Sequence, residues 1–282
     1  MRLTPPARLS AVLSALVFWN AAHAGGEPLS KESIRILKTE QGVRFGIIGD
    51  PPNSPAPTLF ILAGEIEETL VDPSKRQCGG DLADLGYLCV AVDIPCFGKE
   101  RREGEPHGIV GWAGRCAKGE NFVAESNSRL SGVLDRLIRV GYTDEEKVAA
   151  CGTSRGGFLA LHFAAADPRV KCVAAFAPVT DPRVLVEFES LATDPLVESL
   201  SVANHAGRLA GRSIWISIGD RDERVGTDEA VATARGVTSA SLGKGLSADV
   251  ELHVVPEPEG HVTPRGAAEW AARWIEDRLG RP

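Results

Sequence analysis

Residues 147–166 read KVAACGTSRGGFLALHFAAA, and the pattern Gly-x-Ser-x-Gly lies at their centre around Ser154. A short apolar run rich in valine and alanine precedes the serine, and a longer apolar run with helical character follows it. Strand, tight turn and helix in this order predict a nucleophile elbow, whose strained turn lifts the serine oxygen above the sheet edge. Glycine suits positions 152 and 156 because a Cβ there would collide with the neighbouring strand and helix.

The same glycines have two other interpretations, a turn without chemistry and a loop that binds phosphate. Phosphate loops follow the patterns Gly-x-Gly-x-x-Gly or Gly-x4-Gly-Lys-Ser/Thr, and neither pattern occurs here. The helix expected from Arg155 onward directs its first backbone N–H groups toward any negative charge that develops near the serine. Ser154 is therefore the candidate nucleophile.

Apolar runs and helical patterns alternate along the rest of the chain, and the first two runs form a leading antiparallel pair. Such alternation predicts an α/β fold, with a mostly parallel eight-stranded sheet covered by helices on both faces. The strand-like runs are residues 34–37, 43–48, 58–63, 87–92, 147–151, 172–176, 214–218 and 250–255. The helical patterns are residues 121–140, 155–166, 227–242 and 264–279.

The N-terminus has the pattern of a cleaved signal peptide over residues 1–24. Arg2 and Arg8 give a positive charge before a short apolar run, and Ala22-His23-Ala24 supplies the small residues that signal peptidase requires. A membrane anchor needs about 20 apolar residues, so stable membrane insertion is not expected. We therefore expect export to the periplasm or the extracellular space, with residues 25–282 forming a single domain.

Residues 183–211 interrupt the alternation with mixed polar and apolar sequence. A segment of this length between two strands is often a cap over an active site, and the alternative is an ordinary crossover with a long approach loop. Both interpretations remain open at this point, and the substrate preference of the site depends on the choice.

Charge and cysteine content narrow the range of partners and cofactors. The formal net charge of −7, without a basic block, argues against nucleic acid and against anionic membrane surfaces. No Cys-x-x-Cys or His-Glu-x-x-His spacing occurs, so we expect neither a metal nor another cofactor. The runs around Cys89, Cys151 and Cys172 predict buried thiols. An exported protein permits disulfides, for which Cys78, Cys96 and Cys116 in loop-like sequence are the candidates, with their pairing left open.

A nucleophilic serine needs a histidine base and a carboxylate that orients it. His261 follows the last predicted strand, so its loop leaves the edge of the sheet at which the elbow lies. His253 is inside that strand and His162 lies on the helix behind the serine, so neither is expected to reach it. His261 is the predicted base.

The acid is expected in the loop Gly219-Asp-Arg-Asp-Glu-Arg-Val225, which follows the predicted strand 214–218 and gives the α/β order Ser, acid, His. Asp220, Asp222 and Glu223 compete for the role, and Asp181 is a weaker alternative. The residues themselves do not decide among these carboxylates.

Three motifs together resemble the α/β-hydrolase superfamily, in particular its dienelactone-hydrolase-like and prolyl-oligopeptidase-like branch. The motifs are Gly152-Thr-Ser-Arg-Gly-Gly157, Gly219-x-x-Asp222-x-x-Val225 and Gly260-His261, and Asp93-x-Pro95-x-x-Gly98 is a looser match. The resemblance runs from about Thr58 to the C-terminus. In that branch the acid usually lies three residues before a valine, so the resemblance selects Asp222.

The resemblance also implies an oxyanion hole formed by the backbone N–H groups of Glu65 and Arg155. The family often has His-Gly where this chain has Ala63-Gly64, a departure that leaves the backbone donors in place. A Glu65 carboxylate pointing into the site would oppose an oxyanion. Dienelactone hydrolases use a cysteine nucleophile, so their particular reaction is not implied by a serine.

These residues predict an exported serine esterase that cleaves a small-molecule or glycan ester through an acyl-enzyme. The alternative is a serine peptidase of the prolyl-oligopeptidase-like type that acts on short peptides, and a catalytically silent binding protein is a third interpretation. In the peptidase alternative, Arg101, Arg102 and Arg155 are candidates for binding the carboxylate of a peptide terminus, although paired arginines are also common on a solvated surface. Trp112 is either a pocket residue or a buried loop anchor. The sequence does not decide the acyl and alcohol groups or the oligomeric state.

Overall fold

The alternating runs form one eight-stranded sheet in the computed structural model, which describes residues 29–256 and 260–280. The strands are β1 (Ile34–Lys38), β2 (Arg44–Ile48), β3 (Ala56–Leu62), β4 (Leu88–Ala91), β5 (Thr143–Thr153), β6 (Val170–Phe176), β7 (Ser213–Gly219) and β8 (Val250–Val255). Their order is β1-β2-β4-β3-β5-β6-β7-β8. Strand β2 is antiparallel to both of its neighbours, β1 and β4, and all other neighbouring strands are parallel. The predicted α/β fold with a mostly parallel sheet is confirmed.

Burial along the sheet explains why the central strands are continuous apolar runs. All four residues of β4 and the last five residues of β3 are buried, as expected for parallel strands covered on both faces. The edge strands differ, because β1 and β8 contain only half-buried and exposed residues. The central strands are therefore more deeply buried than the edge strands.

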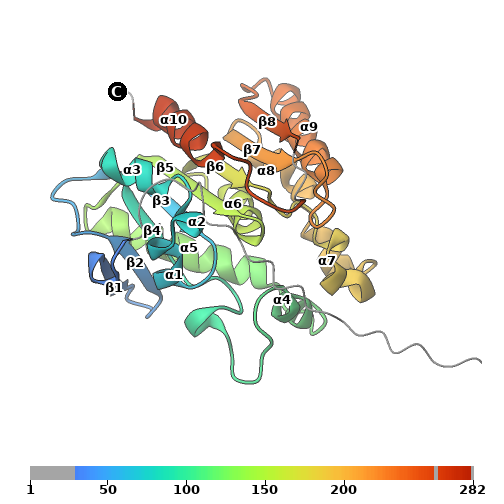
Figure 1. Ribbon diagram of the computed structural model, residues 1–282, viewed down its shortest axis with the longest axis horizontal. Helices are drawn as coiled ribbons and strands as arrows, with labels where there is room; N and C mark the ends of the chain where they lie inside the picture. The colour runs from blue at the N-terminus through green and yellow to red at the C-terminus, as the bar shows by residue number, and fades with distance from the viewer. Residues whose placement is uncertain (1–28, 257–259, 281–282) are drawn as a thin grey trace, which may run out of the picture.

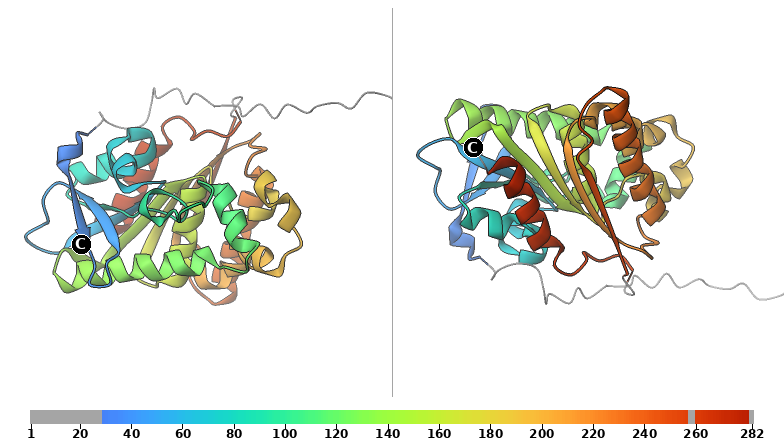
Figure 2. Two further views of the ribbon diagram at one scale, coloured as in Figure 1. Left: turned by 90° about the horizontal axis from the view of Figure 1, so that it is seen from below. Right: turned by 90° about the horizontal axis from the view of Figure 1, so that it is seen from above.

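Helices cover both faces of this sheet (Figures 1 and 2). One layer packs α1 (Ile66–Val71), α3 (Gly79–Asp84) and α10 (Ala267–Leu279) against the strands. The opposite layer contains α5 (Phe122–Arg139), α6 (Arg155–Ala166) and α9 (Thr227–Gly243). The shorter helices are α2 (Pro73–Arg76), α4 (Ile109–Cys116), α7 (Pro195–Ser199) and α8 (Ala206–Leu209), with 3-10 turns at Lys31–Ser33, Gly98–Glu100, Pro182–Val184, Val186–Leu191 and Val202–His205.

Residues 183–211 form a chain of short helical turns with α7 and α8. This segment packs against α4, α6 and α9 at one side of the sheet, where Figure 1 shows α4 and α7 near each other. Phe188, Val197 and Leu209 anchor it, since all three side chains are fully buried. The segment is thus a fixed part of the second helical layer, and a role as a cap remains a prediction.

The cysteines correct one expectation from the sequence. All six are free and buried, including the disulfide candidates Cys78, Cys96 and Cys116. The reason is packing, because Cys78 precedes α3 and Cys116 ends α4, and both side chains face the apolar core. Burial raises the pKa of Cys96 to about 12, so its thiol is a poor nucleophile.

Two predictions concern the N-terminus and the membrane. The proposed signal peptide, residues 1–24, lies outside the residues that the structure describes. Within residues 29–256 and 260–280, none of the helices combines the length and the apolar character that spanning a bilayer requires.

Candidate active site

Ser154 lies at the junction of β5 and α6 with an unusual backbone conformation. Its φ of 55° is in the left-handed region, which side chains other than glycine rarely adopt. Two hydrogen bonds hold the strained residue, since its N–H donates to Phe176 O at 2.8 Å and its carbonyl accepts from Val179 N at 3.1 Å. Neighbouring backbone therefore fixes the turn, and such strain persists only where the surroundings over-determine it.

The flanking glycines are required by the close approach of β3, as the sequence predicts. A Cβ on Gly156 would lie 1.7 Å from Leu62 O, and a Cβ on Gly152 would lie 2.4 Å from the carbonyl carbon of Gly156. Both distances are far below van der Waals contact, and both involve backbone that cannot move aside. These glycines let strand, turn and helix meet tightly enough to present Ser154.

His261 approaches the serine from the loop between β8 and α10. The Ser154 hydroxyl donates to His261 Nε2 at 3.0 Å, and His261 Nδ1–H donates to Asp222 Oδ2 at 2.8 Å. The two bonds together assign the tautomer, because Nδ1 must carry the proton that the carboxylate accepts. The structure thus brings Ser154, Asp222 and His261 into one hydrogen-bonded chain, although the three residues come from distant parts of the sequence.

Asp222 is fully buried and held in place by its own loop. Its Oδ1 accepts from the N–H groups of Arg224 at 3.1 Å and Val225 at 3.2 Å, which leaves Oδ2 directed at His261. The spacing of acid and valine therefore has a physical basis, since the turn that buries Val225 also donates to the carboxylate. One oxygen is used by the turn and the other by the imidazole.

The competing carboxylates lie elsewhere. Asp220 is exposed and forms an ion pair with Arg221 at 3.2 Å, and Glu223 is also exposed. Asp181 accepts from the guanidinium of Arg183, with which it forms an ion pair at 2.6 Å. None of the three has a hydrogen bond to His261 among the described residues.

The two histidines that the sequence excluded, His162 and His253, lie away from Ser154 and pack against other parts of the fold. His162 is buried on α6, where its Nε2 lies 2.9 Å from Leu200 O and burial lowers its pKa to about 3. His253 lies within β8 beside the rings of Trp215 and Trp270. Neither histidine is bonded to Ser154, in agreement with their predicted positions.

The backbone at the end of β3 faces the elbow. The N–H of Gly64 donates to Thr69 Oγ1 at 3.2 Å and that of Ile66 donates to Asp93 Oδ1 at 2.9 Å, so both are occupied. Between them, the N–H of Glu65 makes no hydrogen bond within the described part of the chain. The Glu65 side chain is exposed.

Arg155 begins α6, and the first N–H groups of a helix have no partner inside the helix. Its backbone N–H and that of Glu65 are thus donors on opposite sides of this junction that make no hydrogen bond within the described part of the chain.

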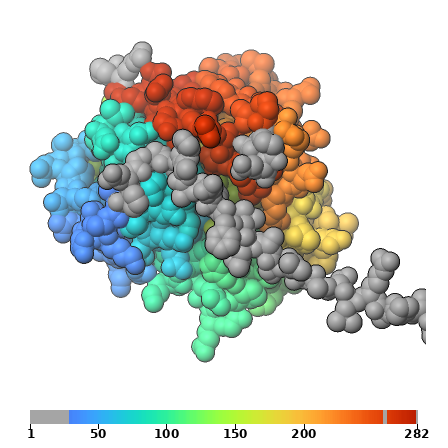
Figure 3. Space-filling view, in the orientation of Figure 1, coloured from blue at the N-terminus to red at the C-terminus, as the bar shows by residue number. Residues whose placement is uncertain are grey.

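A cavity of about 370 Å³ opens beside the serine. It is lined by Ala63, Asp72, Ser74, Lys75, Thr153, Ser154, Arg155, Ala177, His261 and Val262. One wall comes from α2, and Gln77 Nε2, just after this helix, donates to Thr263 Oγ1 at 3.4 Å. In Figure 3 the turquoise α3 lies next to the red α10. No lining residue belongs to 183–211 in the part of the chain that the structure describes.

Trp112 is not among these lining residues. It is 1% exposed, packs against Phe122 and Phe158, and donates from Nε1 to Pro95 O at 2.7 Å. These contacts are those of a buried loop anchor, the alternative that the sequence left open.

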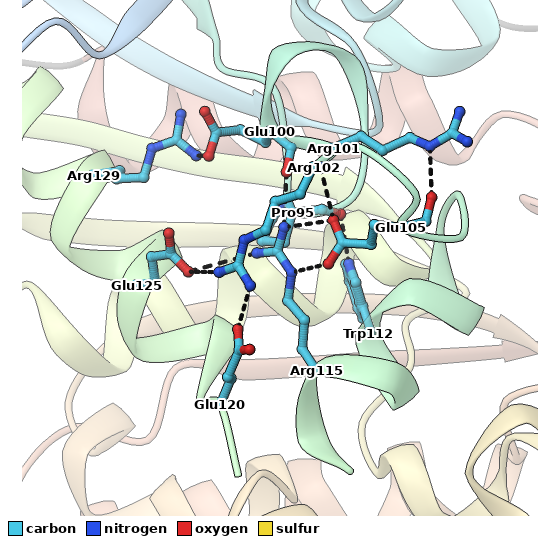
Figure 4. Close-up of polar contacts among 10 residues, drawn as sticks. All are labelled: Pro95, Glu100, Arg101, Arg102, Glu105, Trp112, Arg115, Glu120, Glu125 and Arg129. Atoms are coloured by element: carbon cyan, nitrogen blue, oxygen red, sulfur yellow. Dashed lines mark hydrogen bonds and ion pairs between the residues drawn. The ribbon is translucent and has the colours of Figure 1, made fainter. Parts of the chain in front are cut away.

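The loop that Trp112 anchors contains an ion-pair network, drawn in Figure 4. At its centre the buried Arg115 forms a two-point pair with Glu105, at 2.6 and 2.9 Å. Arg115 lowers the pKa of Glu105 to about 2, so the pair stays charged at neutral pH. The network holds the segment that carries Phe97, whose ring packs under the guanidinium of Arg155.

Sequence reasoning missed the wall formed by Asp72, Ser74 and Lys75. A local signal for α2 exists, because Asp72-Pro73-Ser74 is an N-cap followed by proline at the first helical position, and Asp72 Oδ1 accepts from Ser74 N at 2.9 Å. That signal predicts a helix start, whereas the position of α2 beside His261 depends on the packing of α3 against α10.

The sheet order and the elbow define the chain as an α/β-hydrolase. A model of the prolyl oligopeptidase family matches residues 128–277, which include Ser154, Asp222 and His261. The chain belongs to that family, which confirms the resemblance stated from the motifs. No curated protein matches the chain in sequence.

Solved structures with this fold include esterases and peptidases. Acetyl xylan esterase 1 from Thermoanaerobacterium sp. JW/SL YS485 is similar over 91% of this chain and 96% of its own, with a TM-score of 0.59 and 16% identity. Dipeptidyl peptidase 4 from Porphyromonas gingivalis is similar over 87% of this chain and 35% of its own, with a TM-score of 0.61 and 17% identity. TT1662 from Thermus thermophilus is similar over 88% of this chain and 99% of its own, with a TM-score of 0.64 and 19% identity.

At these identities the likeness concerns the fold. The chain spans between 35% and 38% of the length of the similar peptidase structures. Family and fold together place the chain among proteins whose solved structures are named both as peptidases and as esterases.

Proposed function

We propose that the protein is a serine esterase with a catalytic triad of Ser154, Asp222 and His261. The hydrogen-bonded chain from Asp222 Oδ2 through His261 to Ser154 Oγ is the observation that carries this proposal. His261 Nε2 accepts the hydroxyl proton as Ser154 Oγ attacks the ester carbonyl, and the buried Asp222 carboxylate stabilises the imidazolium that forms.

The tetrahedral intermediate places a negative charge on the former carbonyl oxygen. The backbone N–H groups of Glu65 and Arg155 are the donors we assign to it, and each such donor contributes about 3 kcal/mol of transition-state stabilisation. His261 then protonates the departing alcohol, which leaves the acyl group on Ser154. Water attacks this acyl-enzyme with His261 again as the base, and the carboxylic acid is released.

The cavity supports an ester rather than a peptide substrate. A peptidase that reads a peptide N-terminus needs a carboxylate for its ammonium group, and the carboxylate in this lining belongs to Asp72. Asp72 Oδ1 accepts from the N–H and the hydroxyl of Ser74, at 2.9 and 2.7 Å, so one oxygen of this carboxylate serves as the N-cap of α2. At about 370 Å³ the cavity has the size of a small-ligand pocket. A serine peptidase for short peptides is the second candidate, favoured by the family match.

Turnover of matched substrates tests the proposal. We expect the purified protein to hydrolyse a short-chain 4-nitrophenyl ester with a kcat/KM at least about 100-fold above that for prolyl or aminoacyl 4-nitroanilides, because the lining carboxylate, Asp72, serves as the N-cap of α2. Amide turnover above ester turnover would establish the peptidase instead. Absence of both activities and of labelling by a fluorophosphonate would indicate a binding protein.

We further propose that the protein acts outside the cytoplasm, on a small-molecule or glycan ester, after removal of residues 1–24. The support is the charged start, the apolar run and the small residues at positions 22 and 24. N-terminal sequencing of protein from the periplasm or medium of an expressing bacterium is expected to begin at Gly25. Protein that is retained in the cytoplasm and still begins at Met1 would contradict export.

A further inference from the structure

Arg155 lines the cavity beside the serine, and two contacts hold its guanidinium near the end of β3. Its Nε donates to Ala63 O at 3.0 Å, and the ring of Phe97 packs against the guanidinium with 4.5 Å between Cζ and the ring centroid. Arg155 is also among the residues that line the cavity. The side chain is therefore held by two fixed contacts, and neither of them uses its two terminal amino groups.

Those amino groups have no ion pair or hydrogen bond within residues 29–256 and 260–280. Burial lowers the pKa of the Arg155 guanidinium from its ordinary value, and the Glu68 carboxylate raises it, but an arginine remains charged at neutral pH. Arg155 is half-buried, and a charge that has lost part of its hydration is stabilised by an anionic partner.

The other charged groups near the cavity are already engaged. Lys75 forms an ion pair with Glu68, and the Asp72 carboxylate caps α2. Glu68 is the acid that acts on Arg155, and it is exposed and shared with Lys75. Arg155 is thus the lining cation that lies beside Ser154 in sequence and has no carboxylate within ion-pair distance in the described chain.

The two other arginines considered from the sequence do not have this position. In Figure 4, Arg102 points into the ion-pair network, where it contacts Glu120 at 2.5 Å and Glu125 at 3.6 Å. Arg101 is exposed and donates from Nε to Glu105 O at 2.8 Å. Neither residue lines the cavity.

We propose that Arg155 binds a carboxylate of the substrate, so that the preferred ester carries a carboxylate group near its scissile carbonyl. The planar guanidinium offers two parallel N–H donors to one carboxylate, and its contacts with Ala63 and Phe97 hold it in place for such a ligand. This inference rests on the proposed esterase function and narrows its substrate to an anionic ester.

Two matched pairs of esters test the proposal and distinguish the acyl side from the alcohol side. The acyl pair is 4-nitrophenyl hemiglutarate and 4-nitrophenyl butanoate, and the alcohol pair is 4-acetoxybenzoate and 4-acetoxybenzamide. We expect wild type to prefer the anionic ester in one pair. Arg155→Met should reduce that preference, measured as the ratio of the two kcat/KM values, by at least about tenfold, since bonds to charged groups have this magnitude.

Arg101→Met is the control, because it removes the same charge from an exposed site outside the cavity. It should retain the preference of wild type. A wild type without a preference in either pair, or an Arg155→Met variant that loses activity on all four esters equally, would overturn the proposal. Equal loss would mean that the side chain acts only by holding Ala63.

A binding measurement separates this inference from the esterase proposal. The Ser154→Ala variant cannot form an acyl-enzyme, so glutarate binding to it by calorimetry reports the anion site alone. We expect Arg155→Met in this background to weaken binding by at least about tenfold. If all four esters resist hydrolysis, the esterase proposal fails while glutarate binding that depends on Arg155 still supports the site. Glutarate affinity that is the same with and without Arg155 would overturn it.

Discussion

Replacement of Ser154 by alanine is expected to lower ester turnover by at least about 10⁴-fold without unfolding the protein. The hydroxyl makes one side-chain hydrogen bond, to His261 Nε2, so its removal leaves no buried polar group without access to solvent. The strained turn belongs to the backbone and is held by Phe176 and Val179, which the substitution does not touch. Steady-state kinetics with a 4-nitrophenyl ester, together with thermal unfolding, measures both expectations.

A serine outside the site serves as the control. Ser199→Ala removes an exposed hydroxyl that donates to Leu196 O on α7, and it should change turnover less than about twofold because surface changes have small effects. Mass spectrometry after fluorophosphonate treatment should find the label on the peptide that contains Ser154. A Ser154→Ala variant that keeps more than a tenth of the activity, or a label elsewhere, would exclude this serine as the nucleophile.

The double variant Ser154→Ala, His261→Ala examines whether the two residues act as one unit. If His261 serves only to accept the proton of Ser154, removing both should cost about as much as removing the serine alone. Multiplicative losses would instead indicate that His261 acts on water or substrate independently of Ser154.

The sequence allowed us to predict those features of the site that depend on residues close together in the chain or on the order of the strands. The elbow is recognisable because Gly152 and Gly156 are forced by contacts with the adjacent helix and strand, and those contacts recur wherever strand, turn and helix meet in this way. The role of His261 could be predicted from chain order, because the loops that follow parallel strands lie at the same edge of the sheet. The central strands were recognisable for a similar reason, because burial on both faces requires continuous apolar runs.

What the sequence did not predict depends on packing between distant segments. Asp72 and Lys75 reach the cavity only because α2 lies beside the loop of His261, and no pattern within 72–76 specifies that neighbour. The direction of the Arg155 side chain likewise depends on Phe97, whose loop is held by the buried pair of Arg115 and Glu105. The sequence placed Cys78 and Cys116 in loops because the helices beside them have only six and eight residues, too few for a helical repeat to stand out.

Substitution of Asp222 by asparagine is expected to lower kcat by about 10⁴-fold, although the two side chains have nearly the same shape. Oδ1 accepts two backbone N–H bonds, from Arg224 and Val225, so the carbonyl oxygen of an asparagine would take that position. Its amide nitrogen would then face His261 Nδ1 as a donor. The imidazole would have to carry its proton on Nε2, and it could no longer accept the proton of Ser154.

Asp220→Asn is the matched control, two residues earlier in the same loop. Asp220 is exposed and pairs with Arg221, so we expect its loss to change kcat less than about threefold, as for other exposed ion pairs. The contrast separates the tautomer argument from a general effect of negative charge near the site, because both variants remove one carboxylate from this turn. A large loss in Asp220→Asn with little change in Asp222→Asn would transfer the acid to Asp220, and equal losses would show that His261 responds to charge and not to a directed hydrogen bond.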